Sequence, residues 1–160
     1  MTRTTARELA LQLGFSVVEG EAFAEDALEA FFEEEHYATL AGECGIYDEY
    51  PDEKQMAYIR DLVRLVYDHR VELDAAIEKY ARGWKVGRIS RTAAAILRLA
   101  LSEILYMDDI PNAAAINEAV ELAKKYEPAD TVAFINGVLG GFMRGEMPGE
   151  SSPQVTTTDE

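Results

Sequence analysis

The stretch ISRTAAAILRLALSEILYMDDIPNAAAINEAVELAKKYEPADTVAFINGVLGGF, residues 89–142, decides the fold. Its first part, residues 91–107, is apolar on nearly all sides, which is typical of a helix buried at the centre of a helical domain. Ser90 precedes this helix and can cap it by accepting a hydrogen bond from a free backbone N–H. Pro111 should end the helix, and Asn112 can cap the one that follows.

Two amphipathic helices follow in the same stretch, joined by a turn at residues 127–130. Apolar residues recur in both at spacings of three, four and seven, as on one face of a helix. These are Ile116, Ala119, Val120 and Ala123 in the first helix and Ile135, Val138, Leu139 and Phe142 in the second. Each helix carries an amide near its start, Asn117 or Asn136. Because a buried amide without partners costs about 1–3 kcal/mol, we expect both to fix the packing of these helices rather than to bind a ligand.

The remainder of the chain continues the helical pattern, with further helices expected at residues 4–18, 24–40 and 53–81. No segment alternates in the manner of a strand. The sequence therefore predicts an all-α, compact bundle of about six or seven helices. Residues 1–144 are expected to form a single helical domain, and residues 145–160 a disordered tail rich in Ser, Thr and Pro.

Charge is distributed unevenly along the 160 residues, which carry a net charge of -15 at pH 7. Thirteen acidic residues fall within positions 19–53, where there is no lysine or arginine. Basic residues gather farther along, at Arg82, Lys85, Arg88, Arg91 and Arg98. Most of these charges should form a solvated surface. Their separation nevertheless predicts an acidic face suited to a basic partner and a smaller basic face suited to a polyanion.

Motifs for catalysis, metal binding or cofactor binding are weak. Glu33 and His36 have the Glu-x-x-His spacing of di-metal carboxylate bundles, but the second motif that such a site needs is missing. The single cysteine, Cys44, lies in a glycine-flanked loop and is expected to be a spectator, in keeping with a reducing compartment. No apolar run approaches the roughly 20 residues of a membrane span. We therefore predict a cytoplasmic protein that is not an enzyme and holds no metal or cofactor.

The order of motifs resembles the transcription antitermination factor NusB family. The resemblance lies in the “ILRLA..E” helix, the “DIP” turn, “INEAVELAK”, a short acidic turn and “FINGVL”, together with “TARELALQ” near the N-terminus. It is strong over residues 84–139, recognisable over residues 3–15 and weak over residues 17–51.

This resemblance implies an all-helical fold and a role in transcription of ribosomal RNA. Members of the family bind boxA, a short single-stranded RNA element, together with NusE, which is also a protein of the small ribosomal subunit. That complex joins an antitermination assembly on RNA polymerase. Some members form homodimers, so a homodimer is possible here too.

The resemblance also implies an RNA-binding site, which single-stranded RNA would contact through aromatic rings and basic side chains. The matching positions fall in two groups, one in the first helix and one around the turn between the last two helices. They are Arg3, Arg7, Gln12 and Phe15, and Tyr126, Asp130 and Phe134.

The chain departs from the family pattern where RNA contact is expected. Thr4 and Thr5 replace part of a dense arginine run, Phe15 stands where many members have Tyr, and Gly140 replaces an aspartate. Fewer phosphate contacts should weaken RNA binding by the protein alone, so we expect the basic ribosomal partner to supply positive charge. The alternative is a helical protein–protein adaptor with little or no RNA binding.

Overall fold

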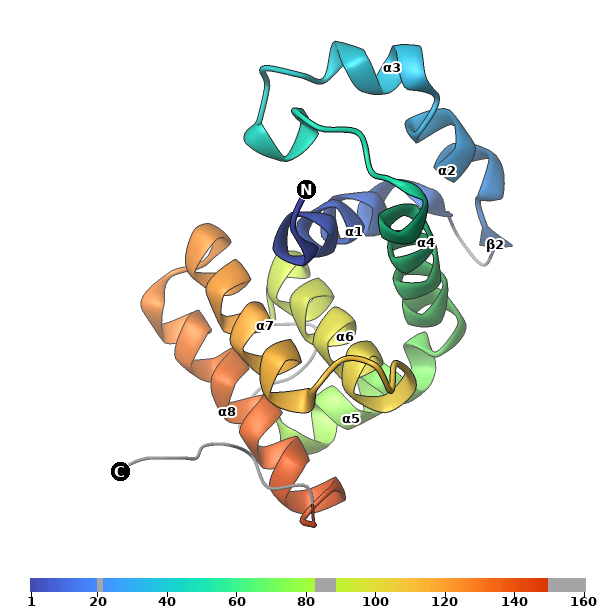
Figure 1. Cartoon of the computed structure of the whole chain (residues 1–160). Helices are drawn as coiled ribbons and strands as arrows, with labels where there is room; N and C mark the ends of the chain where they lie inside the picture. Colours follow the sequence, from blue (N-terminus) through green and yellow to red (C-terminus); the bar gives the residue numbers. More distant parts are fainter. Residues whose placement is uncertain (20–21, 83–88, 150–160) are drawn as a thin grey trace. The chain divides into compact units, whose positions relative to one another are not determined.

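The computed structural model describes residues 1–19, 22–82 and 89–149, and it groups the chain into two compact units, Met1–Asp68 and His69–Glu160. Figure 1 traces the elements of each unit. In the first unit they are α1 (Arg3–Val17), β1 (Val18–Glu19), β2 (Ala22–Phe23), α2 (Glu25–Phe31), α3 (Glu34–Thr39), the 3-10 helix η1 (Gly45–Tyr47) and α4 (Glu53–Asp68). In the second they are α5 (Arg70–Tyr80), α6 (Arg91–Tyr106), α7 (Asn112–Tyr126) and α8 (Ala129–Glu146).

The all-α class is confirmed. In the described part of the chain, extended structure is limited to the antiparallel pair of β1 and β2, in which Val18 lies opposite Phe23. That part contains eight α-helices rather than six or seven, because two of the long helices expected from the sequence are each divided in two. None of the described helices is long and apolar enough to cross a membrane.

The first unit is organised around the pairing of α1 with α4, which lie against each other in Figure 1. Leu9 and Leu13 of α1, together with Ile59 and Leu62 of α4, are fully buried. Their spacings of four and three residues place each pair on one helix face. Burying side chains of this kind stabilises the fold by about 1.5–3 kcal/mol each.

An aromatic cluster stabilises the segment that contains α2, α3 and η1. Its five rings, with centroids 5.1 to 6.3 Å apart for the neighbouring pairs, belong to Phe31, Phe32, Tyr37, Tyr47 and Tyr50. The buried Tyr37 hydroxyl donates to the carbonyl oxygens of Glu49, at 3.0 Å, and Ile46, at 3.3 Å. These bonds connect the loop before α4 to α3. Together with the ring contacts, they give this strongly acidic segment an apolar interior.

The prediction of a single helix over residues 24–40 is wrong, because the chain leaves helical conformation at Glu33, where φ is −63° and ψ is 127°. The Glu33 carboxylate instead caps α3, accepting from the backbone N–H of His36 at 2.8 Å and of Glu35 at 3.3 Å. Capping satisfies N–H groups that have no partner inside the helix. This role also gives a structural account of the Glu33–His36 spacing.

The single helix expected over residues 53–81 is also divided. His69 separates α4 from α5 with a non-helical φ of −109° and ψ of 16°. Its ring stacks on that of Tyr106, with centroids 4.0 Å apart, and its Nδ1 lies 3.1 Å from a Glu72 carboxylate oxygen. Apolar periodicity continues across this position, so the pattern alone did not reveal the interruption.

The second unit is built around α6, ten of whose sixteen residues are buried. It contacts α5, α7 and α8, which confirms the central position expected from its apolar sequence. Arg98 of α6 donates through Nε to Asp74 of α5 at 2.7 Å, and its second N–H group lies 3.3 Å from the other carboxylate oxygen. This two-bond pair fixes the orientation of α5 on α6.

The expected role of the two asparagines is not supported, because Asn117 and Asn136 are both exposed. Ala115, Ala119 and Ala123 form the buried face of α7 with Leu122, and their small side chains allow neighbouring helices to approach. The expected cap at Asn112 is also wrong. Pro111 occupies the N-cap position in extended conformation, and Asn112 is the first helical residue.

One glycine of α8 lies very close to a side chain of α5. A Cβ atom at Gly145 would lie 2.2 Å from the Tyr80 hydroxyl oxygen and 2.8 Å from ring carbons. That hydroxyl donates to the Glu146 carboxylate, which also accepts from Lys79 Nζ at 2.7 Å. At Gly137, in contrast, a Cβ atom would meet no atom of residues 1–19, 22–82 or 89–149 within 4 Å.

We predict opposite effects of alanine at these two glycines. Gly137→Ala should raise the free energy of unfolding by about 1 kcal/mol, because alanine favours helix and has room there. Gly145→Ala should lower it, since Tyr80 must move and lose its bond to Glu146. Urea unfolding followed by circular dichroism measures both, and equal stabilisation by the two variants would contradict the packing described.

We also predict that stability falls at high pH through Tyr37. Burial raises the pKa of its phenol from 10.0 to about 12. Between those values the unfolded chain has lost this proton while the folded chain keeps it, so the free energy of unfolding decreases as pH rises, by at most about 1.4 kcal/mol per pH unit. Denaturant unfolding between pH 8 and 12 should show a shallower decline for Tyr37→Phe than for the unaltered protein. Identical slopes would contradict the assignment.

Candidate functional site

The N-terminal segment before α1 is fixed at both its charged end and its backbone. The Met1 amino group forms an ion pair with Glu49, 2.5 Å away, and the Met1 carbonyl accepts from Gln55 Nε2 at 2.6 Å. Thr2 then lies at the start of α1, where its hydroxyl accepts from the Thr5 N–H at 3.1 Å. The start of the helix that carries the expected arginines is therefore held in place.

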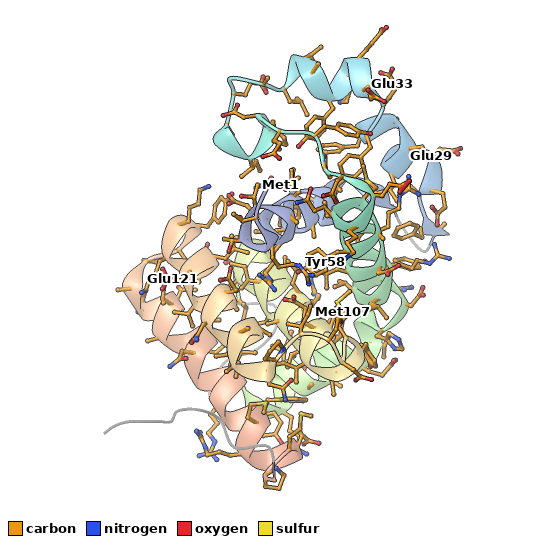
Figure 2. All side chains as sticks on the ribbon, viewed as in Figure 1. Met1, Glu29, Glu33, Tyr58, Met107 and Glu121 are labelled. Carbon is orange, nitrogen blue, oxygen red and sulfur yellow. The ribbon has the colours of Figure 1, made fainter. Side chains whose placement is uncertain are left out.

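The two expected arginines differ in their exposure. The Arg3 guanidinium lies over the ring of Tyr58, 4.2 Å from its centroid, and that of Arg7 lies 5.8 Å from the same centroid. Figure 2 labels Tyr58 on α4 and Met1 at the start of the chain. Arg3 is exposed, whereas Arg7 is only 4% exposed. Arg3 is thus the one whose charge faces solvent.

Gln12 and Phe15 lie farther along α1. Gln12 is half-buried and Phe15 is 39% exposed, an unusual degree for a large apolar ring. At about 100° per residue, Gln12 and Phe15 are about 60° apart around the helix, and Arg3 and Arg7 about 40° apart. Phe15 and Arg7 are about 80° and 12 Å apart, so the four residues form two neighbouring pairs rather than one continuous stripe.

The second group of expected residues surrounds the turn between α7 and α8. The turn is shorter than residues 127–130, because Pro128 caps α8 and Ala129 is already helical. The expected role of Ser90 as the cap of α6 is confirmed, because its hydroxyl accepts a hydrogen bond from the Ala93 N–H at 3.0 Å. Its hydroxyl also donates to the Glu127 carboxylate at 2.8 Å, which anchors the turn to the start of α6.

Tyr126, Asp130 and Phe134 are positioned by this anchored turn. Tyr126 ends α7, and the Lys125 ammonium lies 5.7 Å from its ring centroid. Asp130 is exposed in the first turn of α8, where its carboxylate accepts from the Thr131 N–H at 2.9 Å. Phe134 follows four residues later on the same helix face and is half-buried. Aromatic, acidic and basic groups are therefore available together at one end of the second unit.

The structure places the seven expected site residues in two sets. Arg3, Arg7, Gln12 and Phe15 belong to the first unit, and Tyr126, Asp130 and Phe134 belong to the second. The Ser90–Glu127 bond and Lys125 were not predicted from the sequence. A capping serine before an apolar helix was visible in the sequence, but its second partner, 37 residues away, was not.

The basic cluster expected from the sequence is only partly described. Lys85 and Arg88 lie outside the described residues, as do residues 150–160 of the expected tail. Arg98 is committed to Asp74 and so does not contribute a free charge. Arg82 and Arg91 are exposed.

The described residues contain no cluster placed to hold a metal ion. Among residues 1–19, 22–82 and 89–149, no three His, Cys, Asp or Glu side chains are placed to hold a metal ion. Cys44 is half-buried in the loop that leads into η1. The expected site residues provide rings and charges on helix surfaces.

Comparison with known proteins identifies the family. The model of the NusB family matches residues 4–144. This chain belongs to the NusB family. The transcription antitermination protein NusB of Symbiobacterium thermophilum is 36% identical over 162 residues, covering 99% of this chain and 100% of the relative. The protein of the same name from Ruminiclostridium cellulolyticum is 46% identical over 105 residues, covering 66% of this chain and 72% of the relative.

Solved NusB structures have a similar fold. NusB from T. maritima aligns with a TM-score of 0.63 and 27% identity, covering 94% of this chain and 96% of that one. The solution structure of NusB from Aquifex aeolicus aligns with a TM-score of 0.60 over 96% of this chain and 98% of that one. At 22% identity, the second comparison bears on the fold alone.

We predict that Ser90→Ala lowers the free energy of unfolding by about 1–2 kcal/mol, because it removes both a helix cap and the anchor of the turn. Hydrogen exchange at the amides of Glu127 and Thr131 should accelerate as the turn loosens. Ser90→Thr keeps the hydroxyl and should recover most of the loss. Unchanged melting and unchanged exchange in Ser90→Ala would contradict this role.

Proposed function

We propose that this protein is an RNA-binding transcription antitermination factor that acts on ribosomal RNA transcripts. It would bind boxA-type single-stranded RNA together with NusE, the small-subunit ribosomal protein, within an antitermination complex on RNA polymerase. The observation that carries this proposal is the family match over residues 4–144. Relatives named transcription antitermination proteins, one of them matching along its whole length, support it. This role would place the protein in the cytoplasm.

The chemistry of the expected site suits single-stranded RNA. Splayed bases stack on aromatic rings, and basic side chains hold the phosphates. Phe15 and Phe134 would provide rings, and the exposed guanidinium of Arg3 a phosphate contact. Arg7 is buried, so we assign it first to supporting Tyr58 and Arg3 and only second to direct phosphate contact.

The remaining site residues would recognise bases by hydrogen bonding. Gln12 and Asp130 carry polar groups that can bond base edges, and the phenol of Tyr126 adds both a ring and a hydroxyl. Because the N-terminal arginine content is low, the affinity of the protein alone for RNA should be weak.

Acidic side chains on α2 and α3 suit a basic protein partner. Exposed carboxylates there belong to Glu25, Asp26, Glu29, Glu33, Glu34 and Glu35. Glu29 and Glu33, labelled in Figure 2, project from α2 and from the start of α3. A basic ribosomal protein would both complement this charge and bring positive charge to the RNA.

The net charge of -15 also favours a second candidate function, that of a helical protein–protein adaptor with little or no RNA binding. An adaptor would bind the basic partner without any preference for boxA. Homodimer formation is compatible with either function, and light scattering over a range of concentrations measures it.

We predict that boxA RNA binds in the nanomolar to micromolar range only when the ribosomal partner is present. Fluorescence anisotropy of labelled boxA and scrambled RNAs, with and without the partner, tests this. Arg3→Gln and Phe134→Ala should each weaken boxA binding, with about 1–3 kcal/mol lost for the ring. Arg64→Gln is the matched control, because that arginine is exposed but paired with Glu25 at 2.8 Å.

Two results would contradict the proposal. Equal affinity for boxA with and without the partner would remove the assigned role of the partner. Equal binding of boxA and scrambled RNA under all conditions, with partner binding intact, would favour the adaptor.

A further inference from the structure

A groove of about 500 Å³ lies between the end of α5 and one face of α8. These helices pack against each other within the second unit, as Figure 1 shows. Its lining consists of Tyr80 and Arg82 on the α5 side and of Phe134, Gly137, Val138, Gly141, Arg144 and Gly145 on α8. The α8 part spans eleven steps of helix, or about 16 Å.

The floor of the groove is open because α8 carries glycines where side chains would otherwise fill it. Gly137, Gly141 and Gly145 recur every four residues and so lie on one line along the helix. Packing against Tyr80 accounts for Gly145 and Gly141, where a Cβ atom would come within 2.2 and 3.3 Å of that side chain. At Gly137 a Cβ atom would meet no atom of the described residues within 4 Å, so among those residues nothing fills this part of the floor.

Two arginines face this groove without a partner among the described residues. Arg82 and Arg144 are both exposed, and neither forms a hydrogen bond or ion pair within that part of the chain. The nearby carboxylate of Glu146 is already engaged by Lys79 and Tyr80. Gly140 also provides no side chain that could compete with a ligand for Arg144. A Cβ atom at this position would lie 3.2 Å from an Arg144 guanidinium nitrogen.

Unpaired arginines are notable in a protein with 30 acidic and 15 basic residues. Arg64 and Arg98, by comparison, each pair with carboxylates. Two guanidinium groups beside one groove therefore create a local positive potential that favours an anionic ligand. The half-buried ring of Phe134 and the edge of Tyr80 add aromatic surface to the same groove.

We propose that this groove binds the single-stranded RNA segment that flanks the element recognised at the α7–α8 turn. This inference rests on the proposed function, since Phe134 belongs both to the expected RNA site and to the groove. Arg82 and Arg144 contact phosphates of the flanking nucleotides, and the open floor at Gly137 admits a ribose or base. Guanidinium groups combined with aromatic rings match a nucleotide chain better than an acidic peptide, whose carboxylate side chains offer no aromatic ring to stack.

The test compares a boxA core RNA with the same RNA extended by a short uridine tract on its 5′ or its 3′ side. Affinities are measured over a range of KCl concentrations for the full chain with the ribosomal partner. One extension should bind more tightly than the core. Arg82→Gln and Arg144→Gln should each lower the slope of log affinity against log salt by about 0.7 for that extended RNA, and leave the core RNA unchanged.

Two further variants act without removing an arginine. Gly140→Asp places a carboxylate beside Arg144 and should reproduce the effect of Arg144→Gln. Gly137→Leu fills the floor with a better helix former, so it should abolish the gain from the extension while leaving thermal stability the same or higher. Arg64→Gln again serves as the control for loss of one positive charge.

The outcomes separate the two proposals. If the unaltered protein binds the core RNA but gains nothing from either extension, or if the groove variants lose none of the gain, the groove assignment is overturned and the proposed function stands. If a polyglutamate peptide competes in an Arg82- and Arg144-dependent way while extension gives no gain, the groove is a peptide site and the assignment is also overturned. Absence of any core binding overturns both proposals.

Discussion

Burial of α6 is the constraint on which the second unit depends. Ten of its sixteen residues are buried, so the neighbouring helices α5, α7 and α8 must each present an apolar face to it. Burying Ile96, Leu97 and Leu101 completely contributes about 1.5–3 kcal/mol for each side chain. The small residues of α7, Ala115, Ala119 and Ala123, allow close packing at little cost in side-chain entropy. The helices that carry Tyr126, Asp130 and Phe134 are thus held by a core to which these three residues do not belong.

Polar interactions then fix how these helices are oriented. Arg98 joins α6 to α5 through Asp74, and Ser90 joins the start of α6 to the turn before α8 through Glu127. A third set, Tyr80 and Lys79 with Glu146, joins α5 to the end of α8. Each is a directional bond at the edge of an apolar contact, where geometry is most sensitive to small rotations. They determine where Tyr126, Asp130 and Phe134 lie and how wide the groove beside α8 remains.

Acidic and basic side chains are distributed unevenly over the helices. Acidic side chains on α2 and α3 surround an aromatic cluster and are available to a basic partner. Basic side chains are few, and several of them, such as Arg64 and Arg98, already form ion pairs with carboxylates. The exposed arginines that remain available to an anionic ligand, such as Arg3, Arg82 and Arg144, therefore indicate ligand binding better than the net charge of the chain does.

Much of the fold could be predicted from the sequence because helix formation is a local property. The positions of α1, α6, α7 and α8 followed from apolar periodicity, the Ser90 cap and Pro111, and the ordered motifs identified the family. The breaks at Glu33 and His69 escaped prediction, since the first depends on a glutamate that caps its own helix and the second lies within unbroken periodicity. Asn117 and Asn136 were expected to fix the packing of their helices, yet they lie on exposed positions.

What the sequence by itself determined is the helical class, the NusB family and the residue types that we propose for RNA binding. Only the tertiary structure decided which polar side chains pair with one another inside the fold. Arg98 meets Asp74 across 24 residues, Ser90 meets Glu127 across 37 and Tyr80 meets Glu146 across 66. Periodicity extends over a few turns of one helix, whereas the partner of a charge or hydroxyl is set by helices that are distant in sequence and meet only after folding.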